Sequence, residues 1–78
     1  MLVLFHLRTE EVGADEDTVY RIDEDVDDAG LDDIAYELAR DNAEMYGVED
    51  DEQFSGWWEK LHISEEEAEE LYGEIQNI

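Results

Sequence analysis

The 78-residue sequence predicts a single α+β domain in which an N-terminal β-hairpin packs against about three helices. Two segments with alternating apolar residues come first, and three segments with helical periodicity follow. The sequence contains no proline, and no linker-like stretch or internal repeat divides it. We therefore treat residues 1–78 as one acidic domain.

The first predicted strand covers residues 2–11. Phe5 and Leu7 point to one face of this strand. Leu2 and Leu4 point to the other face, so both faces are apolar at the start of the strand. The second apolar face must be covered either by the C-terminal helix or by a second subunit.

The second predicted strand runs from Thr18 to Glu24, with Thr18, Tyr20 and Ile22 on one face. Residues 13–17 have the composition of a turn and would close a hairpin loop of roughly 3–5 residues. Two strands alone are weak, so the hairpin requires a helix on one face or a further strand at its edge.

The clearest helix is predicted over residues 31–46, between two glycines. Asp32 and Asp33 fall in its first turn, where the helix dipole favours negative charge. Gly47 can adopt the left-handed conformation that ends a helix, with Val48 folding back toward Ala43. The apolar stripe of this helix consists of Leu31, Ile34, Ala35, Leu38, Ala39 and Met45.

A second helix is predicted after Asp50, which fits an N-cap with Gln53 as its reciprocal partner. Gly56 lies inside it and costs about 1 kcal/mol relative to alanine, so the helix should be short or irregular. Its apolar face, at positions i, i+3, i+4 and i+7, consists of Phe54, Trp57, Trp58 and Leu61.

The C-terminal helix begins with a strong signal. Ser64 is the predicted cap, Glu67 the capping-box partner, and Ile63 with Ala68 the hydrophobic staple. Its apolar positions are Ala68, Leu71, Tyr72 and Ile75.

Charge is the dominant feature of the composition. The chain has 26 acidic and 4 Lys or Arg residues, for a net charge of −22. Such a charge opposes compaction, but 42% hydrophobic and 10% aromatic residues are too many for a disordered acidic tail. We expect a folded domain whose anionic surface binds neither nucleic acid nor membranes directly.

The sequence offers no defined catalytic constellation, and we expect no enzyme activity. Cysteine is absent, no glycine-rich phosphate loop is present, and Ser64 is explained as a helix cap. His6 and His62 lie far apart in sequence, and each is interpreted as a structural or surface residue. No cofactor is predicted.

The acidic stretch at residues 23–28 invites a test for a calcium loop. An EF-hand loop requires glycine at position 6 and glutamate at position 12. A loop starting at Asp23 places Ile34 at position 12. A loop starting at Asp25 places Gly30 correctly but puts Tyr36 at position 12. We expect loose attraction of divalent cations and no dedicated metal site.

The near-absence of lysine indicates selection for a negative field, since an ordinary solvated surface mixes both signs. One such selection is adaptation to concentrated salt. The other is imitation of nucleic acid, because duplex DNA carries one charge per about 1.7 Å. At that density, −22 corresponds to roughly 37 Å, or about eleven base pairs.

Aromatic residues are interleaved with acids in residues 36–46 and 54–59. With the length, the charge and the lack of cysteine, this pattern resembles small acidic inhibitors encoded by bacteriophages and mobile elements. These are DNA mimics that inhibit restriction enzymes, CRISPR effectors, uracil-DNA glycosylase or nucleoid proteins. They do not share one fold, so the resemblance implies a mode of action and no correspondence of individual residues.

The resemblance implies a basic nucleic-acid-binding protein as the partner. The N-terminal apolar run is too short for a signal peptide or a membrane span and lacks a basic flank, so we expect a cytoplasmic location, in the host cytoplasm if the chain is phage-encoded. Trp57 and Trp58 diverge by about 100° on a helix, so one should fill the core while the other is partly exposed. A homodimer is plausible because the apolar surface exceeds the needs of so small a core. The predicted partner-binding residues are Asp23, Glu24, Asp25, Asp27, Asp28, Asp32, Asp33, Glu49, Asp50, Asp51, Glu52, Trp58, Glu65, Glu66, Glu69 and Glu70.

An alternative interpretation is a small accessory protein adapted to high salt. In that case the acids would hold water and cations, and a partner would bind through apolar surface.

Overall fold

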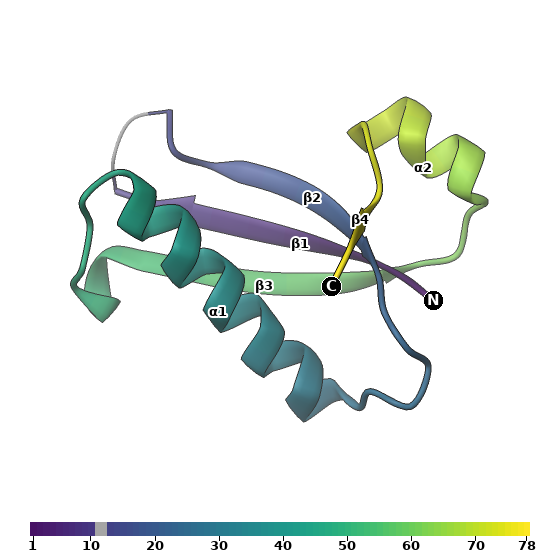
Figure 1. The fold of residues 1–78 in the computed structure, drawn as a ribbon, viewed down its shortest axis with the longest axis horizontal. Helices are drawn as coiled ribbons and strands as arrows, with labels where there is room; N and C mark the ends of the chain where they lie inside the picture. Colours follow the sequence, from purple (N-terminus) through teal and green to yellow (C-terminus); the bar gives the residue numbers. More distant parts are fainter. Residues whose placement is uncertain (11–12) are drawn as a thin grey trace.

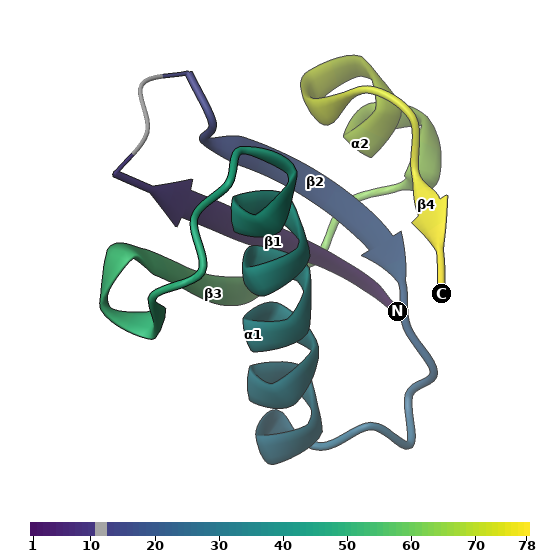
Figure 2. The same ribbon diagram turned by 60° about the vertical axis from the view of Figure 1, so that its left-hand side comes forward.

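A computed structural model describes residues 1–10 and 13–78. Its described elements are β1 (Leu2–Thr9), β2 (Glu16–Arg21), α1 (Asp28–Met45), the 3₁₀ turn η1 (Asp51–Gln53), β3 (Phe54–Leu61), α2 (Glu65–Tyr72) and β4 (Gln76–Asn77). The four strands form one sheet in the order β3-β1-β2-β4 (Figures 1 and 2). β1 is antiparallel to both β2 and β3, whereas β4 is parallel to β2.

The sheet has a different helix on each face. The α1 face is the one to which Val3, Phe5 and Leu7 point, and these residues are buried with Leu31 and other residues of α1. The α2 face is the opposite one, where Leu4 packs with residues from β2, α2 and the C-terminal segment. Leu4 is only 2% exposed, so α2 and the C-terminal segment supply the cover that the apolar second face of β1 requires.

The α+β class is confirmed, as is the hairpin of the first two strands. β2 begins two residues earlier than predicted and ends at Arg21. The described part of β1 ends at Thr9. The predicted extension of the first strand to Glu11 lies outside the described residues.

The prediction of a helix over residues 54–61 is wrong, because this segment is strand β3. Its side chains alternate between the two faces of the sheet. Phe54 and Trp58 pack against the core beneath α1, whereas Leu61 packs against the smaller core on the α2 face. The spacings that resemble a helix arise because residues four apart also share a face of a strand.

Gly56 lies where α1 crosses β3. A Cβ atom at this position would lie 2.6 Å from the carbonyl oxygen of Ala35 and 2.9 Å from the Cβ of Ala39. Only glycine therefore lets the helix approach β3 this closely.

Helix α1 begins one turn before the predicted start, since Asp27 is its N-cap and Gly30 lies inside it. Its C-terminus follows the prediction. Gly47 has a φ of +78°, and the Val48 amide donates to the Ala43 carbonyl at 2.9 Å. Met45, assigned to the apolar stripe, is 75% exposed.

The C-terminal part of the fold is also partly predicted. Ser64 caps α2 through a 3.2 Å bond from the Glu67 amide, and Ala68 is fully buried. Helix α2 ends at Tyr72, and Ile75 enters the core from the segment that follows it. Leu71 is 64% exposed because α2 turns mainly Ala68 toward the sheet.

Candidate functional site

The predicted acidic residues fall into three groups on the surface. The first group lies in the β2–α1 loop and the first turns of α1, the second precedes and includes η1, and the third is on α2. All fifteen acidic residues of the predicted set are exposed. The first two groups lie at opposite ends of α1 (Figures 1 and 2). The third group lies on α2, which packs on the opposite face of the sheet. The structure therefore distributes these acids around the molecule and does not gather them into one patch.

The first group is ordered by hydrogen bonds and one ion pair. The Asp27 side chain accepts the Gly30 amide at 2.8 Å, and the Asp23 side chain accepts the Asp25 amide at 2.9 Å. Asp28 lies 3.4 Å from the ammonium of Lys60 on β3. Several carboxylates at this end of α1 are thus held in fixed directions.

The second and third groups are anchored in similar ways. Asp50 accepts the Glu52 amide at 2.9 Å, and Asp51 accepts the Tyr36 hydroxyl at 3.1 Å. On α2, Glu65 forms an ion pair with Arg21 of β2. The other acids of α2 project from a helix that Ser64 caps.

The two tryptophans have distinct environments on opposite faces of β3. Trp58, included in the predicted set, is partly buried against α1, and its indole Nε1 donates to Asp32 at 2.7 Å. Trp57 is 48% exposed on the α2 face. The more accessible of the two tryptophans is therefore Trp57, which the predicted set omits.

Trp57 belongs to a cluster that the sequence reasoning missed. Its ring stacks on the imidazole of His6 with centroids 5.2 Å apart, and the Arg8 guanidinium lies 5.3 Å from the Trp57 ring centroid. The Oδ1 atom of Asp17 lies 2.9 Å from both Arg8 and His6. His6 Nε2 lies 3.2 Å from Glu59. The alternation in β1 predicts that His6 and Arg8 share one face of the strand. Trp57 joins them only if residues 54–61 form a strand, which the sequence analysis did not predict.

Hydrogen bonding lowers the pKa of the Asp17 carboxyl below its ordinary value of 3.8. The bond from Arg8 is the main cause, and the His6 contact acts in the same direction against the opposing effect of burial. Asp17 is thus maintained as a carboxylate between Arg8 and His6.

Comparison with family models, curated proteins and solved structures finds no match. The site must therefore be interpreted from its own geometry.

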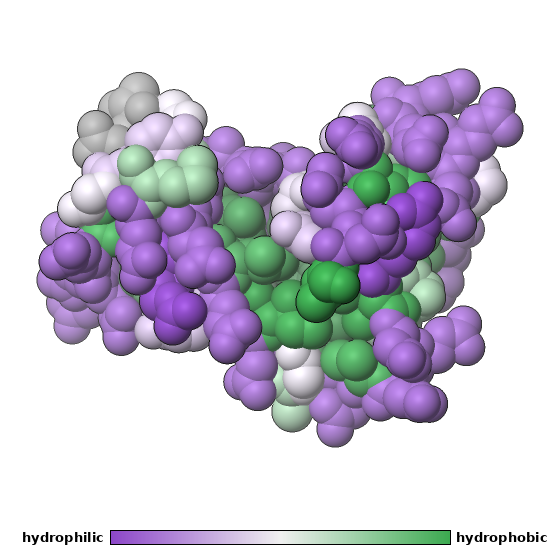
Figure 3. Space-filling view, viewed as in Figure 1, coloured by the Kyte–Doolittle hydropathy of each residue, from purple (hydrophilic) through white to green (hydrophobic). Residues whose placement is uncertain are grey.

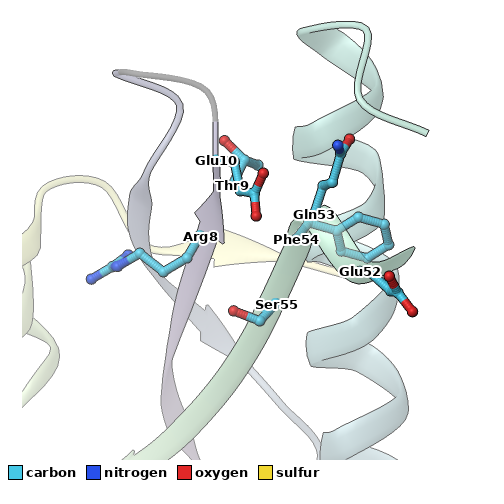
Figure 4. Close-up of a pocket in the computed structure, with 7 residues that line it drawn as sticks. All are labelled: Arg8, Thr9, Glu10, Glu52, Gln53, Phe54 and Ser55. Carbon is cyan, nitrogen blue, oxygen red and sulfur yellow. The ribbon is translucent and has the colours of Figure 1, made fainter. Parts of the chain in front are cut away.

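A shallow pocket lies where β1 ends beside the start of β3. Its lining includes the side chains of Arg8, Glu52, Phe54 and Ser55 (Figure 4). Of the predicted partner-binding residues, only Glu52 lines it.

The acidic groups do not converge on a point. Within residues 1–10 and 13–78, no set of three or more His, Cys, Asp or Glu side chains is placed to hold a metal ion. No helix in the same part of the chain has the length and apolar character needed to cross a bilayer.

Proposed function

We propose that this protein is a non-enzymatic DNA mimic that occupies the basic nucleic-acid-binding surface of another protein, such as a CRISPR effector or a restriction enzyme. The observation that carries the proposal is the density of fixed negative charge. The net charge of −22 is distributed over a body 35 Å long, or about one charge per 1.6 Å. Duplex DNA carries one charge per about 1.7 Å of its axis.

The scaffold supports this proposal because it holds its carboxylates on ordered elements. Asp27, Asp50 and Asp32 accept hydrogen bonds from the protein itself, so each side chain has a restricted direction. A cationic cleft that binds such groups loses little side-chain entropy and releases counterions from both surfaces. The three acidic groups provide separate points of contact for a cleft that wraps around the domain.

The proposal is tested by affinity capture from a bacterial lysate with the immobilised protein, at about 0.05 M and about 0.5 M salt. We expect nucleic-acid-binding proteins to be retained at the lower concentration, released at the higher one, and displaced by duplex DNA. Retention that is unchanged by salt and by DNA contradicts the proposal.

A matched pair of variants separates charge position from net charge. One variant carries Asp33→Asn, Glu49→Gln and Glu69→Gln, with one change in each acidic group. The control carries Glu10→Gln, Glu37→Gln and Glu74→Gln, which remove the same charge from exposed positions outside the predicted set. Because a charge-assisted contact contributes about 1.5–3 kcal/mol, the first variant should lose at least about tenfold in affinity for a captured partner, and the control much less. Equal losses would contradict recognition by position.

Salt adaptation of an accessory protein is the second candidate, and the exposure of Met45 and Ile78 favours it. These side chains are 75% and 76% exposed and offer apolar surface to a partner. This candidate predicts unfolding at low salt with recovery in molar potassium chloride, and a partner that stays bound as salt rises.

A further inference from the structure

The α1 face of the sheet is only half covered. Helix α1 packs on β3 and β1, at one side of the four-stranded sheet. The rest of this face is formed by β2, with the two-residue strand β4 beside only its C-terminal end. Between these strands and α1 runs a groove lined by Tyr20, Ile22, Ile34, Leu38, Met45 and Ile78. Figure 3 shows this groove as an apolar band with hydrophilic residues on both sides, in a hollow of the molecular surface.

The spacing of strands and helices shows how much of this face α1 covers. Neighbouring strands lie about 4.8 Å apart, whereas packed helices lie about 8–10 Å apart. One helix therefore covers about two strands, as α1 does over β1 and β3. Beside α1 the face continues with β2 and, next to Tyr20 and Arg21, with the two-residue strand β4, and a further helix would lie along this strip.

The groove contains two depressions, one after the other along its length. One lies between β2 and the C-terminal half of α1, where Tyr20 faces Leu38 and Met45. The other lies toward the N-terminal half of α1 and is lined by Ile22, Ile34 and Ile78. Apolar side chains spaced along one face of an amphipathic helix would enter the two depressions in turn.

The charges along the groove identify the chemistry of its occupant. Glu16 and Asp41 border the first depression, and Asp23 borders the second. Burial, followed by the charges of Glu16 and Asp41, raises the pKa of the Tyr20 hydroxyl, so both carboxylates act on this end of the groove. Arg21 also borders the second depression, but its guanidinium is bound to Glu65 and Asn77.

A second copy of this chain fits poorly, because it would bring another charge of −22 to the acidic residues that border the groove. We propose that the groove binds an amphipathic α-helix of the partner protein, with an apolar stripe that enters the groove and Lys or Arg side chains on both flanks. This inference rests on the proposed function only for the cationic character of the partner. It adds an apolar contact to the electrostatic contacts of that function.

The test uses a fluorescently labelled peptide of about 18 residues, the length of α1, with leucines at i, i+3, i+4 and i+7 and lysines elsewhere. The control peptide has the same composition in an order without an apolar stripe. Binding is followed by fluorescence anisotropy and peptide helicity by circular dichroism. We expect the amphipathic peptide to become helical and to bind at least about tenfold more tightly than the control peptide.

Variants of the full chain locate the site. Met45→Glu and Ile78→Glu change exposed side chains and should not impair folding, which circular dichroism verifies. Each adds a negative charge, so pure electrostatics would strengthen binding of a basic peptide, whereas loss of the apolar contact should weaken it about tenfold. Leu71→Glu, at a 64% exposed position on α2, is the matched control and should not weaken binding.

The possible outcomes separate this inference from the proposed function. Equal binding of both peptides, or no weakening by Met45→Glu and Ile78→Glu, overturns the helix-binding groove while leaving salt-sensitive capture unaffected. Groove-dependent peptide binding without salt-sensitive capture supports the groove and contradicts the DNA mimic. Self-association that Met45→Glu abolishes, measured by sedimentation, assigns the groove to a second copy and overturns the inference.

Discussion

Single side chains on both faces of the sheet show how this molecule places its few cations. Arg8 binds Asp17 and lies over the ring of Trp57, so its charge is used within the protein surface. Arg21 is similarly bound to Glu65, and Lys60 to Asp28. These pairs restrain the sheet and its connections, while most carboxylates of residues 1–10 and 13–78 have no cationic neighbour.

The Asp17–Arg8 contact predicts a particular pH dependence. The pKa of Asp17 is lower in the folded protein than its ordinary value of 3.8, so its stabilising contribution is present above pH 3.8. That contribution is lost as the pH falls through the folded pKa. We therefore expect the stability advantage of the wild type over Asp17→Asn to shrink below pH 3.8, as measured by urea unfolding at a series of pH values.

Removing any acid also relieves repulsion, so this prediction requires a control of equal charge. Asp33→Asn removes one charge from an exposed position whose side chain makes no hydrogen bond or ion pair among the described residues. Its stability should lie above that of Asp17→Asn at neutral pH, and the gap should close in acid. A gap that is absent or independent of pH refutes the stabilising role of the Arg8 contact.

At the scale of elements, the close approach of α1 to β3 explains why Gly56 interrupts an otherwise bulky strand. Gly56→Ala places a Cβ atom 2.6 Å from the Ala35 carbonyl oxygen, which belongs to the helix backbone and cannot rotate away. We expect a loss of about 1–3 kcal/mol in the free energy of unfolding, measured by urea denaturation. Ser55→Ala, at the exposed neighbouring position, should change this energy by less than about 0.5 kcal/mol. Wild-type stability of Gly56→Ala would contradict this packing.

The same strand shows what the sequence can and cannot predict. The hairpin, α1 and α2 follow from local signals, namely alternation, a stripe and caps. For residues 54–61 the local pattern fits both a helix and a strand, and the decision comes from pairing with β1, which is distant in sequence. The two apolar faces of β1 were a usable hint, since a central strand is covered on both sides. The two-residue strand β4 has no local signal at all.

The candidate site is predictable to a similar extent. The exposure of the acidic residues follows from their chemistry, and the cap at Ser64 follows from a motif. The cluster around Trp57 and the open part of the α1 face both depend on the order of strands in the sheet. Long-range pairing determines that order, so local periodicity in the sequence cannot predict these two features.

At the scale of the whole molecule, self-repulsion links stability to ionic strength. The domain measures 35 × 27 × 16 Å and carries a net charge of −22. The Debye length is about 30 Å at 0.01 M salt, so there each carboxylate repels nearly all the others. At 0.15 M it is about 8 Å, and only neighbouring carboxylates still interact strongly.

We therefore expect the urea midpoint of unfolding to rise steeply between about 0.01 M and about 0.15 M potassium chloride and to change much less above that range. Because the apolar core beneath α1 is independent of salt to first order, the protein should already be folded at the lower concentration. The measurement is urea denaturation followed by tryptophan fluorescence across the salt series. A urea midpoint that stays unchanged up to 0.15 M would mean that charge repulsion does not limit stability. Folding that appears only at molar salt would favour adaptation to a saline environment over imitation of DNA.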